Sequence, residues 1–145
     1  EFRLKIAKEL GATAVVNAKE DIVTLLRKVN DGRLADQVII CTGATSAFMQ
    51  SLLLVERAGT ILCFAATEPG VTLPIPVNDF WRKSIKIMHS YGGAPLDIAQ
   101  AIEILQKRSI EVKKLITHRL ALKEAARGFV LAAEAKECVK VILKP

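Results

Sequence analysis

Apolar runs that alternate with amphipathic segments are the feature that most constrains the fold of this chain. The runs begin at residues 14, 37, 60 and 85, so each starts 23 to 25 residues after the one before. This interval accommodates a strand, a crossover helix and two turns, which is the connection that parallel strands need. The runs lack polar alternation, as expected of strands buried on both faces. The pattern therefore predicts an α/β fold whose parallel sheet is covered by helices on both sides.

The expected elements follow one another along the chain. Strands are predicted at Ala14–Asn17, Gln37–Cys41, Thr60–Ala66 and Ile85–Ser90. Helices are predicted before Gly11, over Ile22–Val29, around Phe48–Val55, as a short turn at Asn78–Lys83, and from Pro95 to Arg108. In the last of these, the buried face is expected to consist of Ile98, Ala101, Ile102 and Leu105.

The pattern changes after residue 110. The sequence predicts an extended Val112–Leu120, then a helix, then a final strand at Val139–Leu143. The inward face of that helix is expected to carry Leu122, Ala125, Ala126 and Phe129. This tail need not belong to the same sheet as the earlier strands.

The composition is that of one globular domain and argues against several partners. With 145 residues, 51% of them hydrophobic, the chain is long enough to bury a core. The net charge of +6 is spread over helical segments among Glu and Asp, which argues against nucleic acid as a partner. Apolar runs of about six residues are far short of the ~18 that span a bilayer, and no secretory signal is recognised. Because Cys41, Cys63 and Cys138 have no clip-like spacing, we expect buried thiols in a cytoplasmic protein.

Three strand ends are the expected ligand site. In doubly wound sheets, ligands bind in the crevice beyond the carboxyl ends of the strands. Here those ends carry Cys41-Thr42-Gly43, Phe64-Ala65-Ala66 and Ser90-Tyr91-Gly92-Gly93. The three tips are expected to line one crevice.

Residues that carry chemistry are scarce. His89 and His118 are the only histidines, and neither has a Cys, His or carboxylate partner at a metal-binding spacing. Pairs of carboxylates spaced for acid–base work are absent, as is a Gly-x-Ser-x-Gly elbow. The sequence therefore predicts no catalytic residue and no metal ligand, and it assigns His118 a structural hydrogen bond.

Several short segments, in order and in register, carry a family resemblance. They are Arg3-Leu4, Ala7-Lys8-Glu9-Leu10-Gly11-Ala12, Val38–Ala44 (VIICTGA), Leu115–Leu120 (LITHRL), Glu124-Ala125 and Val139–Leu143. Along nearly the whole chain they resemble the medium-chain zinc-dependent alcohol and polyol dehydrogenases, nearest the sorbitol and threonine dehydrogenase branch. The resemblance implies NAD or NADP as cofactor, zinc in the parent enzyme, and a small alcohol or polyol as substrate.

The resemblance also implies what this chain lacks. In that family the zinc ligands, the glycine-rich phosphate turn and the ribose-binding acidic residue all precede the position of Glu1, and Glu1 itself falls past that acidic residue. We therefore expect residues 1–110 to be a Rossmann-like cofactor domain without its first βαβ unit. Residues 111–145 are expected to complete a catalytic domain that lies outside this chain. The chain alone is expected to be inactive.

Cofactor-binding roles carry over only to matching positions, and each has a plainer alternative. Arg3 matches an arginine beside the adenine and ribose, or is a solvated residue of the first helical turn. The tip formed by Cys41, Thr42 and Gly43 matches one that passes the cofactor, although core packing explains Cys41 equally well. Lys140 matches a basic residue near the pyrophosphate, or is a solvated lysine on an edge strand.

The other two tips are matched in the same way. Phe64, Ala65 and Ala66 correspond to the segment beside the nicotinamide, although Ala-Ala stands where many members have glycine. Ser90 and Tyr91 correspond to the tip near the nicotinamide and the subunit contact, and ordinary core or interface packing explains Tyr91 as well. The resemblance further implies a homo-oligomer formed through the strand Ile85–Ser90, whose unpaired edge would invite pairing.

The missing first strands raise the question of what lies beside Gln37–Cys41. We expect one of two arrangements: neighbouring strands supplied by residues outside this chain, or direct pairing of Ala14–Asn17 with Gln37–Cys41. A different function also stays open, in which the chain is a stand-alone nucleotide-binding or interaction module without catalysis. A phosphate-cradling turn, which such a nucleotide site needs, is not recognised in the sequence.

Overall fold

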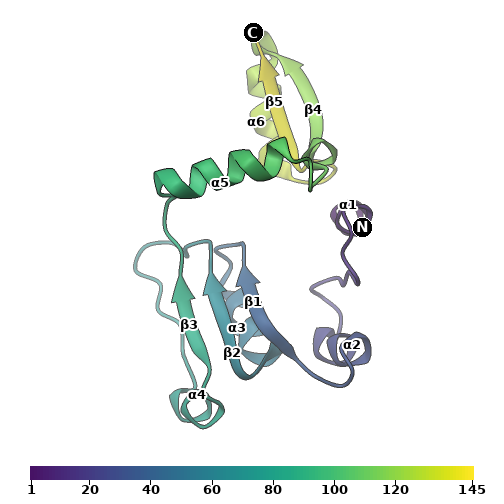
Figure 1. Ribbon diagram of the computed structural model, residues 1–145. Coiled ribbons are helices and arrows are strands. Elements are labelled where there is room, and N and C mark those ends of the chain that lie inside the picture. The colour runs from purple at the N-terminus through teal and green to yellow at the C-terminus, as the bar shows by residue number, and fades with distance from the viewer. The chain divides into compact units, whose positions relative to one another are not determined.

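The structure is a computed structural model that describes residues 1–145. It divides into two compact units, and Figure 1 labels their helices and strands. One unit comprises Ala18–Gly92, and the other combines Glu1–Asn17 with Gly93–Pro145. None of the helices is long and apolar enough to cross a membrane.

The unit Ala18–Gly92 is built around a parallel sheet of the predicted kind. Its strands are β1 (Ala35–Ile40), β2 (Val55–Cys63) and β3 (Lys86–His89), in the order β1-β2-β3. Its helices are α2 (Ile22–Val29), α3 (Thr45–Leu54) and α4 (Val77–Lys83). The register is set by pairs such as Ile40 with Cys63 and Cys63 with His89. The α/β class and the parallel sheet are therefore confirmed.

One face of this sheet packs against α3 and forms the core. The buried residues are Ile40, Phe48, Val55, Ile61 and Phe80. Ile61 lies in the middle strand and is fully buried, which stabilises the folded state by about 1.5–3 kcal/mol relative to leaving its side chain in water. The long apolar runs of the sequence thus predict the position of the core.

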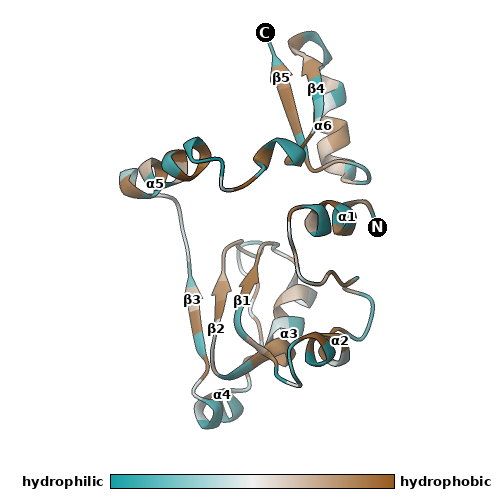
Figure 2. Ribbon diagram, turned by 45° about the vertical axis from the view of Figure 1, so that its right-hand side comes forward, coloured by the Kyte–Doolittle hydropathy of each residue, from teal (hydrophilic) through white to brown (hydrophobic).

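The opposite face of the sheet is not covered as expected. A row of paired residues, Ile39, Leu62 and Met88, runs across the three strands on that face. Ile39 is 58% exposed and Met88 is 54% exposed, and the apolar colour of the strands is visible in Figure 2. The prediction of a sheet buried on both faces is wrong for this chain. A continuous apolar run shows that its residues favour burial, but it does not determine whether a helix packs on each face of the sheet.

The edge of β1 rules out one of the two expected arrangements. Ala14–Asn17 is irregular, so the predicted first strand is wrong, and β1 pairs only with β2. The second edge of β1 carries no strand of this chain, so direct pairing with Ala14–Asn17 is wrong, whereas a neighbour supplied by residues outside the chain stays a prediction. The predicted first strand is absent because a run of four residues gains little from extension without a neighbour, and isolated strands are not stable. Packing of α3 on one face holds the sheet together instead.

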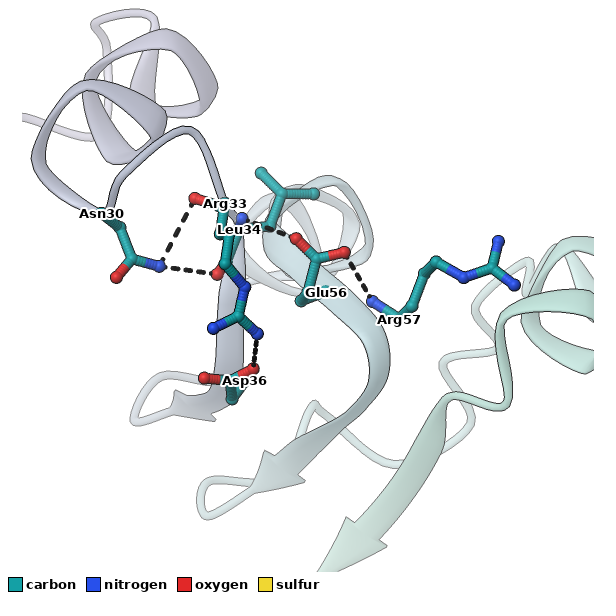
Figure 3. Close-up of polar contacts among 6 residues, drawn as sticks. All are labelled: Asn30, Arg33, Leu34, Asp36, Glu56 and Arg57. Atoms are coloured by element: carbon teal, nitrogen blue, oxygen red, sulfur yellow. Dashed lines mark hydrogen bonds and ion pairs between the residues drawn. The ribbon is translucent and has the colours of Figure 1, made fainter.

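Strand β2 begins five residues earlier than predicted, directly after α3. Its start contains an irregularity, with Ala58 in the left-handed region at φ 60° and Gly59 close behind it. Glu56 fixes this segment, because its two carboxylate oxygens accept hydrogen bonds from the backbone N–H groups of Leu34 and Arg57, each at 2.9 Å (Figure 3). A side chain thus ties the segment before β1 to the start of β2.

The other unit contains a two-stranded parallel sheet of β4 (Ile116–Ala121) and β5 (Lys140–Lys144). Its helices are α1 (Phe2–Glu9), α5 (Pro95–Gln106) and α6 (Ala125–Glu134), with short 3-10 turns at Val112–Leu115 and Leu122–Glu124. The start of the expected extended segment after residue 112 is therefore helical. The strands predicted near the C-terminus are confirmed with small shifts of their ends.

Two predicted helix faces in this unit are wrong. In α6, Gly128 is the buried residue and lies against the side chains of Leu120, Val141 and Leu143, whereas Phe129 is 73% exposed. A small residue allows the helix to approach the sheet closely, and this contact rotates the bulky residue outward. In α5 no residue is buried, and the face with Ile98 and Ile102 is about half exposed. The spacing of apolar residues correctly predicts both helices, but it does not determine which face of each helix packs against another element.

Candidate functional site

The carboxyl ends of the three parallel strands are tied together by the backbone. The carbonyl of Ile40 accepts hydrogen bonds from the N–H groups of Phe64 at 3.0 Å and Ala65 at 3.1 Å. The carbonyl of Cys63 accepts one from the N–H of Ser90 at 3.1 Å. The predicted tips therefore lie at neighbouring strand ends on one side of the sheet, as the sequence indicates.

The first two tips are in close contact. A Cβ atom added at Gly43 would stand 2.4 Å from the carbonyl oxygen of Ala66, which is a backbone atom with no freedom to turn away. Only glycine permits this approach. The glycine that the resemblance assigns to cofactor approach thus has a local packing role.

A cavity of about 350 Å³ opens beside these tips, on the face of the sheet that α3 covers. Its polar lining residues are Thr42, Thr67 and His89, and no Lys, Arg, Asp or Glu lines it. The apolar part of the lining consists of Ile40, Ala44, Phe48, Cys63, Ala65, Ala66, Val71, Leu73, Ile75 and Ile87. Such a hollow suits an uncharged, largely apolar group that is oriented by a few hydroxyl and backbone contacts.

The predicted tip residues divide into two groups. Thr42, Ala65 and Ala66 line the cavity. The others, which are Cys41, Gly43, Phe64, Ser90 and Tyr91, lie at the same strand ends but do not line it. Phe64 is 62% exposed and Tyr91 fully exposed, so the alternative that Tyr91 is a core residue is wrong. Cys41 is exposed as well, so neither its core packing nor the expectation of three buried thiols holds.

Sequence reasoning missed several residues that line the cavity. Ile87 and His89 were detectable, because the two-residue alternation of β3 places them on the same face of the sheet. Leu73 and Ile75 belong to the segment between β2 and α4, where no periodicity signals an inward face. Cys63 lies one position before Phe64, the first residue of the second predicted tip.

The remaining two predicted site residues, Arg3 and Lys140, belong to the other compact unit. The guanidinium Nη2 of Arg3 donates a hydrogen bond to the carbonyl of Cys138 at 3.0 Å, across 135 positions of the sequence. Lys140 is exposed, and its carbonyl accepts a hydrogen bond from the hydroxyl of Thr117 at 3.2 Å. Arg3 therefore has a structural partner within the chain, in place of a purely solvated position.

Thr117 connects β4 to the start of β5. Besides its bond to the carbonyl of Lys140, its Oγ1 accepts a hydrogen bond from the N–H of Val139 at 3.1 Å and lies 3.0 Å from Nδ1 of His118. These contacts span the irregularity in the pairing of β4 with β5. The structural hydrogen bond predicted for His118 is confirmed.

The charges near the strand ends are few. Burial raises the pKa of the Cys63 thiol, which therefore stays neutral at neutral pH. Two carboxylates of this unit have a lowered pKa and do not line the cavity: the N–H of Arg57 and then that of Leu34 lower the pKa of Glu56, and the hydroxyl and N–H of Thr24 lower that of Asp21. Asp21 thereby caps the start of α2.

The chain provides no zinc site. Nowhere do three His, Cys, Asp or Glu side chains come close enough together to hold a metal ion. Structural zinc takes four ligands and catalytic zinc takes three from the protein, so these residues do not fit the ion. Zinc chemistry cannot be derived from this chain's own residues.

A parallel three-stranded sheet with crossover helices, and with a cavity at its carboxyl edge, defines a Rossmann-like α/β fold. The comparison with known families is more specific, because a sequence model of the family described as zinc-binding dehydrogenase matches residues 1–107. The chain belongs to this family.

Individual relatives support the same assignment. A sorbitol dehydrogenase of Halalkalibacterium halodurans is 30% identical over all of this chain, which spans 42% of that protein. An L-threonine 3-dehydrogenase of Bacillus subtilis is 31% identical with the same two coverages. The chain thus spans less than half the length of the curated relatives that it matches.

Solved structures agree in fold. An alcohol dehydrogenase of Thermotoga maritima superposes on 99% of this chain with a TM-score of 0.87 and 29% identity, over 40% of its own length. A zinc-binding dehydrogenase of Sinorhizobium meliloti, solved with NADP bound, superposes on 99% of this chain with a TM-score of 0.86 and 25% identity, over 42% of its own length. The fold of this chain is thus that of the corresponding part of these larger dehydrogenases.

Proposed function

We propose that this chain is the part of a zinc-dependent alcohol or polyol dehydrogenase that contributes the later strands of the NAD(P)-binding domain. The observation that carries the proposal is the cavity at the carboxyl ends of β1, β2 and β3, in a chain that belongs to the zinc-binding dehydrogenase family. The chemistry that a bound nicotinamide would supply is the acceptance or donation of a hydride. Support for NAD(P) comes from the NADP-bound relative and from the resemblance to sorbitol and threonine dehydrogenases.

In this proposal the strand ends hold the uncharged end of the cofactor. Thr42 supplies a hydroxyl, and Ala65 and Ala66 supply backbone groups at the wall of the cavity. Phe64, Ser90 and Tyr91 flank the opening, and Cys41 and Gly43 shape the first tip. Arg3 and Lys140 are proposed to bind the adenine ribose and the pyrophosphate in the whole protein, where a cation offsets phosphate charge.

The proposed organisation has two parts. Residues 1–110 are the cofactor-binding part, and residues 111–145 complete the catalytic domain of the whole enzyme. The family match over residues 1–107 supports this division. Substrate and zinc would then be bound by residues outside this chain, because the chain has no cluster of metal ligands.

The first test is made on the natural protein that carries this sequence. The protein is isolated with an antibody raised against this chain, and its intact mass is measured. We expect a mass of roughly 35–40 kDa, the size of two ordinary domains. The protein is also expected to reduce NAD or NADP in the presence of a polyol or secondary alcohol. A natural protein of 15.8 kDa without such activity would contradict the proposal and favour a stand-alone binding module.

The second test addresses the cavity itself in that protein. Ala65→Phe fills the hollow and is expected to raise the KM for NAD(P) by about tenfold or more, because the added ring takes the place of the bound group. Met88→Phe is the matched control, since it adds similar bulk to the exposed opposite face of β3. Equal KM values for the two variants would show that the cofactor does not use this cavity.

A further inference from the structure

Two metal-ligating side chains lie next to each other in the wall of the strand-end cavity. Cys63 on β2 and His89 on β3 are partners in the parallel register, and both line the same hollow. Register partners on adjacent strands project from the same face of the sheet, with their backbones about 4.8 Å apart. A thiol and an imidazole are therefore presented side by side to whatever enters the cavity.

The remainder of the lining determines which ion the pair would accept. Besides Thr42 and Thr67, the other lining side chains are apolar, and no carboxylate is among them. Hard cations such as Mg²⁺ and Ca²⁺ need several oxygen ligands and find too few here. Sulfur and imidazole nitrogen are instead the ligands preferred by soft ions such as Cu(I).

We propose that Cys63 and His89 form a binding site for a soft monovalent metal ion, of the Cu(I) and Ag(I) kind, within the strand-end cavity. On binding, a bond forms between the ion and Sγ of Cys63, and the thiol proton is released to solvent. The imidazole nitrogen of His89 supplies the second bond without loss of a proton. No electron is transferred, so the step needs no oxidant or reductant.

The other two thiols of the chain are poorer candidates. Cys41 is exposed at the end of β1, does not line the cavity and follows the last register pair, Ile40 with Cys63. Cys138 is 3% exposed, does not line the cavity, and its Sγ lies 4.0 Å from the hydroxyl of Thr117. Only Cys63 combines access to a cavity with a ligating partner.

The test uses the purified 145-residue chain, titrated with Cu(I) under anaerobic conditions against a coloured Cu(I) chelator. The expected result is one tightly bound ion per chain. Cys63→Ser is expected to weaken binding by about 100-fold and His89→Ala by about tenfold or more. Cys41→Ser and Cys138→Ser, which each remove one thiol, are expected to bind as the unsubstituted chain does. Ag(I) serves as a second probe that does not change oxidation state.

The same experiment separates the proposal from general thiol binding. If Cys63→Ser keeps its affinity, if His89→Ala binds unchanged, or if Cys41→Ser or Cys138→Ser abolishes binding, the proposed pair is wrong. Far-ultraviolet circular dichroism of each variant checks that the fold is retained. Because the readout is metal binding by the chain itself, its outcome is independent of whether the whole protein uses NAD(P).

Discussion

Gly43 lies directly against the backbone carbonyl of Ala66, so that a Cβ on Gly43 would stand 2.4 Å from that oxygen. Gly43→Ala is therefore expected to lower the free energy of unfolding by about 1–3 kcal/mol, because the added methyl group would overpack against a backbone atom that cannot move aside. Urea denaturation followed by circular dichroism measures the change. Gly93→Ala is the matched control, because a Cβ there meets nothing within 4 Å. Equal effects of the two substitutions would contradict the close contact.

A second prediction concerns Ala58, which stands at φ 60° near the start of β2. Left-handed backbone costs an L-residue about 1–2 kcal/mol, and glycine avoids most of this cost. Ala58→Gly is expected to stabilise the chain by up to about 1 kcal/mol, after allowance for the greater freedom of glycine in the unfolded state. Ala47→Gly, in the first turn of α3, is expected to destabilise it by up to about 1 kcal/mol. Thermal unfolding of both variants tests whether their signs are opposite.

A third prediction concerns pH and Glu56. Hydrogen bonds from the N–H groups of Arg57 and Leu34 lower the pKa of this carboxyl in the folded state below its ordinary value of 4.5. A lowered folded pKa stabilises the chain above the unfolded value, and this stabilisation is lost as the pH falls through the folded value. Glu56→Gln is therefore expected to flatten the loss of stability on acidification below about pH 4.5.

Urea midpoints measured across that pH range, for the unsubstituted chain and for Glu56→Gln, provide the comparison. Glu68→Gln removes a carboxylate from the exposed segment after β2 and serves as the control. Parallel pH profiles for the unsubstituted chain and Glu56→Gln would mean that Glu56 does not contribute to the pH dependence.

A fourth prediction concerns self-association through the open edge of β3. Because the N–H of Ser90 points to β2, alternation along the strand directs the N–H of His89 to the open edge. If two copies pair through this edge, His89→Pro should abolish the dimer by removing a donor, whereas His89→Ala keeps the donor and should remain dimeric. Sedimentation velocity at high concentration measures this. A strictly monomeric unsubstituted chain would exclude pairing at this edge.

A fifth prediction is that the chain alone is catalytically inert. The reason is that no three ligating side chains are close enough together to hold zinc. The assay combines the purified chain with zinc, NAD or NADP and a panel of polyols and secondary alcohols, followed by absorbance of the reduced cofactor. Turnover above a control without protein would contradict this prediction and would show that the chain itself carries catalytic groups.

The sequence predicts the strands of the sheet better than it predicts which faces of those strands are covered. The runs that contain Ile40 and Ile61 identified two strands of the core, because burial of several consecutive apolar residues leaves few other solutions. The same reasoning failed for Ile39, which belongs to the same run but lies on the open face. A run shows which residues favour burial, whereas the covering partner is a property of the whole arrangement.

The sequence predicts where the candidate site lies, but it does not predict all of the residues that line the cavity. The strand ends followed from the parallel topology, which places all carboxyl ends at one edge. His89 follows from extending the alternation of β3 by one step, yet Leu73 and Ile75 reach the cavity from an irregular segment. No periodic pattern encodes the path of such a segment. Gly128 was missed for a related reason, since a close approach of helix and sheet depends on the partner side chains of Val141 and Leu143.

The hydroxyl of Thr117 lies where the pairing of β4 with β5 is irregular, between Ile116 and His118. Its Oγ1 accepts a hydrogen bond from the N–H of Val139 and contacts the carbonyl of Lys140 at 3.2 Å, Nδ1 of His118 at 3.0 Å and Sγ of Cys138 at 4.0 Å. A hydroxyl has one hydrogen and two lone pairs, so this single group serves several neighbours at once. One side chain thus substitutes, across the irregular stretch, for part of the backbone ladder that regular parallel strands would form.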